Sequence, residues 1–184
     1  MTTTIVTIAI VLALAVAGVL GFAASKPDRF EIRRAASVNA PPEKIFPLIN
    51  DLHAQASWSP FEKDPNMKRM HSGALQGKGA VYEWDGNREV GAGRISIKDS
   101  TPSRIMLDLE MTRPFAARNE VEFTLVPNGG NTTIVTWAMR GPQPFLGKVI
   151  NLFIDCEKMV GKQFEQGLAN LKAIAEGTRQ AQLQ

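Results

Sequence analysis

The fold is decided by a stretch near the end of the chain, residues 145–176, which reads FLGKVINLFIDCEKMVGKQFEQGLANLKAIAE. Its apolar residues recur at steps of three, four and seven, which is the spacing of one stripe along a helix. The charged residues fall largely off this stripe. We therefore predict one long amphipathic helix whose stripe must be covered by another layer. The stripe includes Phe153, Val160, Phe164, Leu168 and Leu171.

The covering layer is predicted between residues 30 and 140, where short segments alternate apolar and polar residues. In one of them Val121, Phe123 and Leu125 alternate with glutamate and threonine. Turn signals such as Pro127-Asn-Gly-Gly130 separate the segments. We expect an α+β fold in which a curved antiparallel sheet wraps around the long C-terminal helix, because this arrangement buries both apolar faces.

A short helix is predicted after the first strand. Ile45, Ile49 and Leu52 are spaced to form one apolar face of it. Prolines stand where the first turn is expected, and a proline is tolerated there. Asn39 is expected to cap the helix, since asparagine is a preferred N-cap residue. This helix is expected to close one end of the sheet.

The first 25 residues contain no Lys, Arg, Asp or Glu. Residues 5–24 form an apolar run in which only Thr7 is polar. A helix of this length is about 30 Å long, which matches the hydrocarbon thickness of a bilayer. We therefore predict a single transmembrane helix and a single-pass membrane protein. A cleaved signal peptide is the alternative, although the apolar run is longer than the usual 7 to 15 or so residues and lacks a basic start.

The charges that flank the apolar run predict its orientation. Lys26, Arg29, Arg33 and Arg34 follow the run, and no charged side chain precedes it. The positive-inside rule then places the folded domain in the cytoplasm.

Three parts of the chain are expected. Residues 1–25 are the transmembrane anchor, residues 26–176 the folded domain, and residues 177–184 a flexible C-terminal tail.

Small residues repeat every fourth position along the apolar run, and such a stripe allows two helices to pack closely as a homodimer. Chance in an alanine-rich segment is the alternative. The repeat consists of Ala9, Ala13, Ala17 and Gly21.

The composition excludes several classes of function. With 44% hydrophobic and 21% charged residues, the chain suits one globular domain. A net charge of +3 without basic clusters argues against nucleic-acid binding. Cys156 is the only cysteine, which excludes an internal disulfide and a cysteine-based zinc site. We expect no metal and no cofactor.

Several motifs in this order resemble the SRPBCC superfamily, the helix-grip fold of START lipid-transfer domains and birch-pollen-allergen-like proteins. The resemblance is closest to the polyketide cyclase/dehydrase-like group and covers about residues 30–176. It implies a deep apolar cavity between the sheet and the long helix, but brings no catalytic motif onto particular positions. The motifs are VNAPPEKIF at 38–46, WSPF at 58–61, GKGAVYEW at 77–84, TIVTW at 133–137 and FEQGLANL at 164–171.

Aromatic residues of the loop, the sheet and the long helix are the candidate ligand contacts. Core packing is the alternative for each of them, because a buried aromatic ring stabilises a fold without any ligand. The candidates are Trp58, Tyr82, Trp84, Trp137, Phe153 and Phe164.

An enzyme acting in this cavity would need titratable groups that converge on it. The two histidines, His53 and His71, are expected on the surface. Glu83 is the candidate catalytic residue, because it lies beside a glycine-rich strand on a side that the pattern leaves open. If it points inward with Arg94 or Arg104 nearby, it would bind a polar head group or act as a base.

The sequence thus favours a membrane-anchored protein that binds a hydrophobic small molecule or a lipid in a cavity between the sheet and the C-terminal helix. One alternative is an enzyme of polyketide cyclase/dehydrase type acting on an aromatic or lipophilic substrate. Another is a protein-interaction or stress-response module whose pocket is vestigial. The absence of common catalytic motifs favours binding over catalysis.

Overall fold

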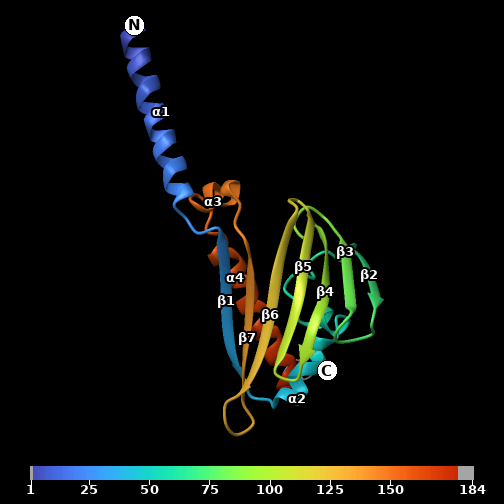
Figure 1. Cartoon of the computed structure of the whole chain (residues 1–184). Coiled ribbons are helices and arrows are strands. Elements are labelled where there is room, and N and C mark those ends of the chain that lie inside the picture. Colours follow the sequence, from blue (N-terminus) through green and yellow to red (C-terminus); the bar gives the residue numbers. More distant parts are fainter. Residues whose placement is uncertain (1, 178–184) are drawn as a thin grey trace. The chain divides into compact units, whose positions relative to one another are not determined.

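The computed structural model of the chain describes residues 2–177, so the predicted C-terminal tail lies almost wholly outside the described residues. The chain divides into two compact units (Figure 1). The anchor unit contains residues 1–30 and 142–156, and the sheet unit contains residues 31–141 and those from 157 onward.

The sheet unit is built on a seven-stranded sheet of order β1-β7-β6-β5-β4-β3-β2. Consecutive strands from β2 to β7 pair antiparallel through short turns, as the alternating segments and turn signals predict. The strands are β1 Arg29–Val38, β2 Lys68–Gly73, β3 Ala80–Asp85, β4 Ala92–Thr101, β5 Arg104–Arg113, β6 Ala117–Pro127 and β7 Thr133–Pro142.

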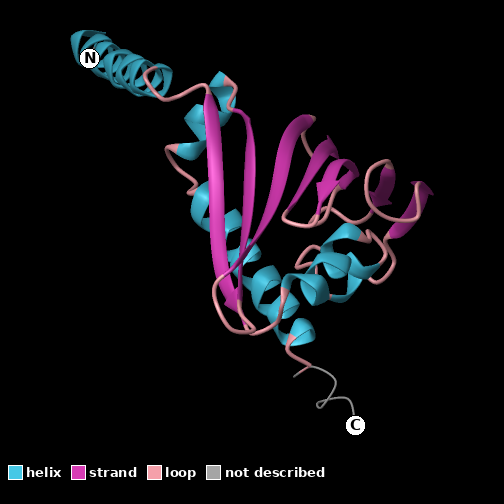
Figure 2. Ribbon diagram, turned by 60° about the horizontal axis from the view of Figure 1, so that its bottom comes forward, coloured by secondary structure: helices cyan, strands magenta, loops and turns pink. Residues whose placement is uncertain are grey.

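The sheet curves around the last helix, α4, which spans Cys156–Ala175 (Figure 2). The helix buries Phe164, Leu168 and Leu171, three residues of the predicted stripe. The predicted α+β architecture, a curved antiparallel sheet around a C-terminal helix, is therefore confirmed.

The prediction of one continuous helix over residues 145–176 is wrong. A short helix, α3, spans Phe145–Asn151, and the chain then leaves helical geometry before α4 begins at Cys156. Asn151 and Asp155, both weak helix formers, flank the interruption. Phe153 lies between the two helices with 76% of its surface exposed, so it does not belong to the buried stripe.

The short helix after the first strand is α2, Pro42–Asn50, and it is followed by the 3₁₀ turn η1, Ala54–Ser57. Ile45 and Ile49 of its predicted apolar face are fully buried, whereas Leu52, the third predicted residue, is buried beyond the end of the helix. The predicted cap is wrong, because Pro41 occupies the N-cap position. The backbone N–H of Asn39 instead donates to Glu176 Oε1 at 2.6 Å, which ties the end of β1 to the end of α4.

The two faces of the sheet differ as the alternation predicts. Val121, Phe123 and Leu125 of β6 are buried. Between them, Glu122 lies 3.7 Å from Arg140 of β7 in an ion pair on the opposite face. The apolar face thus supplies the core of the unit, and the charged face meets water.

The anchor unit contains the first helix, α1, Thr2–Ala24. Its segment Thr3–Ala24 is long and apolar enough to cross a membrane, and the large apolar side chains from Ile5 to Phe22 are exposed. The predicted helix is therefore confirmed, while its insertion into a membrane and its orientation stay predictions.

Candidate functional site

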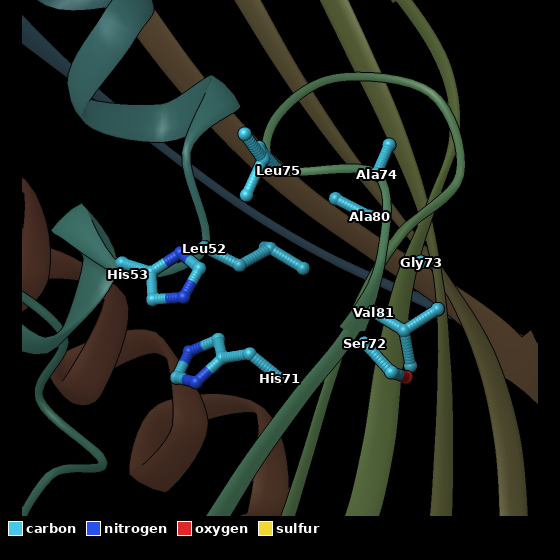
Figure 3. Close-up of a pocket in the computed structure, with 9 residues that line it drawn as sticks. All are labelled: Leu52, His53, His71, Ser72, Gly73, Ala74, Leu75, Ala80 and Val81. Atoms are coloured by element: carbon cyan, nitrogen blue, oxygen red, sulfur yellow. The ribbon is translucent and has the colours of Figure 1, made fainter.

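A pocket of about 110 Å³ opens in the sheet unit between the loop after α2 and the β2–β3 hairpin (Figure 3). Leu75 forms part of its rim and has 85% of its surface exposed, so the pocket is accessible from solvent. Most of its side chains are apolar, and two are imidazoles. They include Leu52, Ala74, Leu75, Ala80 and Val81 with His53 and His71.

The two histidines meet in this pocket, although they are 18 positions apart in the sequence. Their ring centroids lie 3.9 Å apart with an interplanar angle of 15°. His53 comes from the loop between α2 and η1, and His71 from β2 (Figure 3). The expectation that both are surface residues holds for His53, whose side chain is 53% exposed. His71 is half-buried on the exposed strand β2, and its Nε2 is buried.

The imidazole pair continues into a column of rings that we call the ring stack, consisting of His53, His71, Tyr82 and Trp84. The centroids of His71 and Tyr82 are 4.8 Å apart, and those of Tyr82 and Trp84 are 5.9 Å apart, at interplanar angles of 25° and 27°. The strand register explains the column. His71 lies directly opposite Tyr82, and residues two apart in one strand share a face.

A glycine makes room for the end of the ring stack. Gly93 of β4 lies opposite Trp84 of β3. A Cβ atom at Gly93 would lie 2.7 Å from Trp84 Cζ2 and 2.6 Å from the backbone oxygen of Glu110. The glycine at position 93 therefore lets the indole and the neighbouring backbone approach the strand closely.

An ion pair at the edge of the ring stack holds Tyr82 in place. The Tyr82 hydroxyl donates to Glu62 Oε1 at 2.7 Å, and Arg69 Nε donates to Glu62 Oε2 at 2.8 Å. Burial, followed by the hydrogen bond to Glu62, raises the pKa of Tyr82. Glu62 in turn raises the pKa of Arg69. Tyr82 is therefore a neutral hydrogen-bond donor next to the pocket.

An alkaline titration of the folded protein is expected to show no phenolate near pH 10, the usual pKa region of tyrosine. Because Tyr82 is the only tyrosine, the change in near-ultraviolet absorbance that accompanies phenolate formation reports this group alone. With the folded pKa raised, Tyr82 contributes stability that is present below about pH 10 and lost as the pH rises further. The same titration in denaturant should show an ordinary midpoint, and equal midpoints in both conditions would contradict the prediction.

Two polar features supply hydrogen-bonding and acid–base groups at the pocket. His71 Nε2 is buried and has no hydrogen-bond partner in the part of the chain that the structure describes. Asp51 Oδ1 accepts the backbone N–H of His53 at 2.8 Å and lies 3.1 Å from His53 Nδ1. A carboxylate at this distance fixes the orientation of an imidazole and supports its action as an acid or base. An unpaired buried nitrogen is a suitable partner for a polar group on a ligand.

The predicted ligand contacts are found in three places. Tyr82 and Trp84 belong to the ring stack. Phe153 is exposed in the anchor unit. Trp58, Trp137 and Phe164 instead form an aromatic core in which each is buried.

The aromatic core fills the space between the sheet and α4 at the point where Trp137 faces Phe164. The rings of Trp137 on β7 and Phe164 on α4 stack with centroids 4.1 Å apart and an interplanar angle of 7°. Trp58 packs edge-on against Trp137 at 5.6 Å and donates its Nε1–H to the backbone oxygen of Leu48 at 2.8 Å. No room for a ligand remains between the stacked rings. A ligand-binding role for these three residues stays a prediction.

Glu83 lies on the other face of β3 from Tyr82. Its carboxylate is 3.8 Å from Arg94 Nε. The predicted neighbour Arg94 is thus present, while Arg104 pairs with Asp99 at 3.7 Å. This charged face carries the ion pairs of the sheet, so the geometry does not bring Glu83 to the pocket, and its catalytic role stays a prediction. Within residues 2–177, no group of three or more His, Cys, Asp or Glu side chains is placed to hold a metal.

The sequence model of one protein family matches residues 29–176, which is most of the chain. The description of that family is polyketide cyclase/dehydrase and lipid transport. The chain belongs to this family. The resemblance found in the sequence motifs is therefore confirmed. A comparison with curated proteins gave no significant match.

Solved structures show the same fold at low sequence identity. The Zhui aromatase/cyclase from a Streptomyces species has a TM-score of 0.60 and 14% identity, covering 80% of this chain and 94% of that one. A Mesorhizobium loti protein has a TM-score of 0.59 and 16% identity, covering 81% and 98%. A Thermus thermophilus protein has a TM-score of 0.55 and 19% identity, covering 81% and 99%.

The polyketide cyclase/dehydrase and lipid transport family joins proteins that carry hydrophobic molecules with proteins that transform them. Both activities require a place for an apolar ligand. In this member of the family, the pocket beside the ring stack offers apolar side chains, flat rings and polar groups together.

Proposed function

We propose that the chain is a membrane-tethered protein that binds a hydrophobic small molecule or lipid, with a ring or a similarly sized apolar group of the ligand in the pocket beside the ring stack. The observation that carries this proposal is the apolar pocket walled by the stacked rings of His53 and His71. Family membership supports the class of ligand.

The size of the pocket limits how much of the ligand it holds. A cavity of about 150 Å³ is known to take up benzene. The pocket of about 110 Å³ therefore suits one ring or a short apolar chain, with the rest of the ligand outside the exposed rim at Leu75. A ligand with a hydrogen-bonding group next to its ring would satisfy His71 Nε2, which has no hydrogen-bond partner within residues 2–177.

The tether supports the same proposal. The helix α1 exposes apolar side chains along its length, and Lys26 and Arg29 follow it. We propose that α1 crosses the membrane with the sheet unit on the cytoplasmic side. Hydrophobic ligands partition into the bilayer, so a tether raises their effective concentration at the pocket.

Blocking the rim of the pocket is expected to remove the bound ligand. Leu75→Trp adds a large side chain at the rim, whereas Met70→Trp adds the same side chain at an exposed position one residue before His71, on the opposite face of β2. The full-length proteins would be extracted from their membranes and examined by native mass spectrometry and organic extraction. Leu75→Trp should retain about tenfold less lipophile than wild type.

The control separates blocking from misfolding. Met70→Trp should retain one defined lipophile near a one-to-one ratio, as should the wild type. An empty wild-type protein, or equal retention in both variants, would contradict binding in this pocket.

A cyclase or dehydrase reaction is the second candidate, and the contact between Asp51 and His53 at the pocket favours it. His53→Phe keeps a flat ring in the stack but removes the acid or base. For turnover of an aromatic polyketide-like substrate, kcat should fall about 10²- to 10⁴-fold in this variant. Ligand retention should be unchanged, and full turnover by His53→Phe would exclude an acid–base role for this residue.

A further inference from the structure

The anchor unit carries a second apolar surface besides α1. Four large apolar side chains from α3 and the segment after it are exposed, and all fall within ten residues of the chain. We call this surface the α3 patch. Its members are Phe145, Leu146, Phe153 and Ile154.

Helix α3, which carries part of this patch, lies beside the C-terminal end of α1 (Figure 1). Ala23, in the last turn of α1, is fully buried. Asp28, just beyond α1, makes two contacts with the α3 segment. Its backbone oxygen accepts the N–H of Gln143 at 2.7 Å, and its carboxylate accepts from Lys148 Nζ at 2.6 Å. Lys148 is itself buried, while the Asp28 side chain is 93% exposed, so the pair joins the inside of the anchor unit to its surface.

The charges around the end of α1 suit the boundary between hydrocarbon and headgroups. Lys26 places its Nζ 4.3 Å from the centre of the Phe22 ring, which puts an apolar ring and a cation at the same level. Arg29 adds a second cation. Asp28, which lies between these two cations in the sequence, forms an ion pair with Lys148, and the hydrogen bond from Lys148 lowers the pKa of the Asp28 carboxyl.

We propose that the α3 patch lies in the interfacial region of the same bilayer that α1 crosses. The proposal rests on the proposed transmembrane anchor and goes beyond it by giving the chain a second, interfacial membrane contact. Three observations favour a lipid surface as the occupant: the patch adjoins an apolar helix of membrane-spanning length, cations flank it, and the carboxylate of Asp28 beside it is paired with Lys148. Such a contact would fix the rotation and tilt of the anchor unit at the membrane.

Site-directed spin labelling of the full-length protein tests this proposal. The protein would be reconstituted in vesicles of phosphatidylcholine and phosphatidylglycerol after Cys156→Ser removes the native thiol. Single labels would be placed through Leu12→Cys in α1, Phe153→Cys in the α3 patch and Leu75→Cys in the sheet unit. Collision with oxygen, which concentrates in lipid, would be compared with collision with a water-soluble nickel chelate.

The Phe153 label is expected to be at least several-fold less accessible to nickel than the Leu75 label, which has a similarly exposed parent residue. It should also be shallower than the Leu12 label. Adding Leu146→Asp and Ile154→Asp should return the Phe153 label to water while the Leu12 label stays deep. This second result separates insertion of the patch from insertion of α1.

Each other outcome overturns the proposal in a distinguishable way. A deep Leu12 label with a nickel-accessible Phe153 label would remove the α3 patch from the membrane and leave the anchor intact. A nickel-accessible Leu12 label would overturn the anchor and the patch together. Dipolar broadening of the Phe153 label that disappears on dilution with unlabelled protein would identify a second copy of the chain as the occupant.

Discussion

Replacing Trp137 with alanine is expected to lower the free energy of unfolding by about 3 to 5 kcal/mol, the range for buried aromatic residues. The Trp137 ring stacks on Phe164 at 4.1 Å, lies 4.9 Å from Phe123, and meets Trp58 and Phe61 edge-on. Its removal therefore opens a cavity where the sheet, the loop that carries Trp58 and Phe61, and α4 meet. Domains of this size are stable by only about 5 to 15 kcal/mol, so the variant should be close to unfolding at moderate temperature.

A urea titration of the full-length protein in detergent micelles, followed by circular dichroism, measures this effect. Phe115→Ala is the matched control, because Phe115 lies exposed in the turn between β5 and β6. Its removal should change the free energy of unfolding by no more than about 0.5 kcal/mol. A loss at Trp137 as small as that at Phe115 would mean that the aromatic core does not hold the sheet to α4.

Two arginines in the middle of α1 are expected to prevent membrane insertion. Leu12 and Val16 are exposed apolar residues near the centre of the helix. Each arginine at a helix centre disfavours insertion by about 2.5 to 3.5 kcal/mol, and the favourable contributions of the original residues are lost as well. The double variant Leu12→Arg with Val16→Arg should therefore leave the membrane fraction in a carbonate wash.

The control for this prediction is Leu12→Ala with Val16→Ala, which shortens the same side chains without adding charge. This variant should stay in the membrane fraction. Retention of the arginine variant would argue that α1 associates with the membrane, or with other proteins, without crossing the bilayer.

Periodicity predicted most of the fold, and its one error has a simple cause. Phe164, Leu168 and Leu171 occupy successive turns of one helix and are buried as expected. Phe153 stands seven positions before Val160, a spacing that also arises when two separate helices follow each other. The weak helix formers that break the run are polar residues, and polar residues also occur on the outer face of a continuous helix.

The candidate site was predictable only in part. Tyr82 and Trp84 were named because they are aromatic and lie in a recognisable strand. His53, His71 and Glu62 were missed as site residues, since their convergence depends on the path of a loop and on the register of β2 against β3. Register is set by turn geometry and core packing, and a polar edge strand such as β2 carries little pattern from which to read it.

The close approach of Trp84 to Gly93 has a consequence for recognising relatives that share this pocket. Any side chain at position 93 would collide with the indole across the β3–β4 pair and with the backbone oxygen of Glu110, so glycine is required at position 93 even when the residue at position 84 is small. Position 93 should therefore stay glycine among homologues with this backbone, while the residue at position 84 is free to vary. A glycine at the first paired with a tryptophan at the second would mark those family members that keep the same aromatic wall, even where overall identity is as low as that of the solved structures.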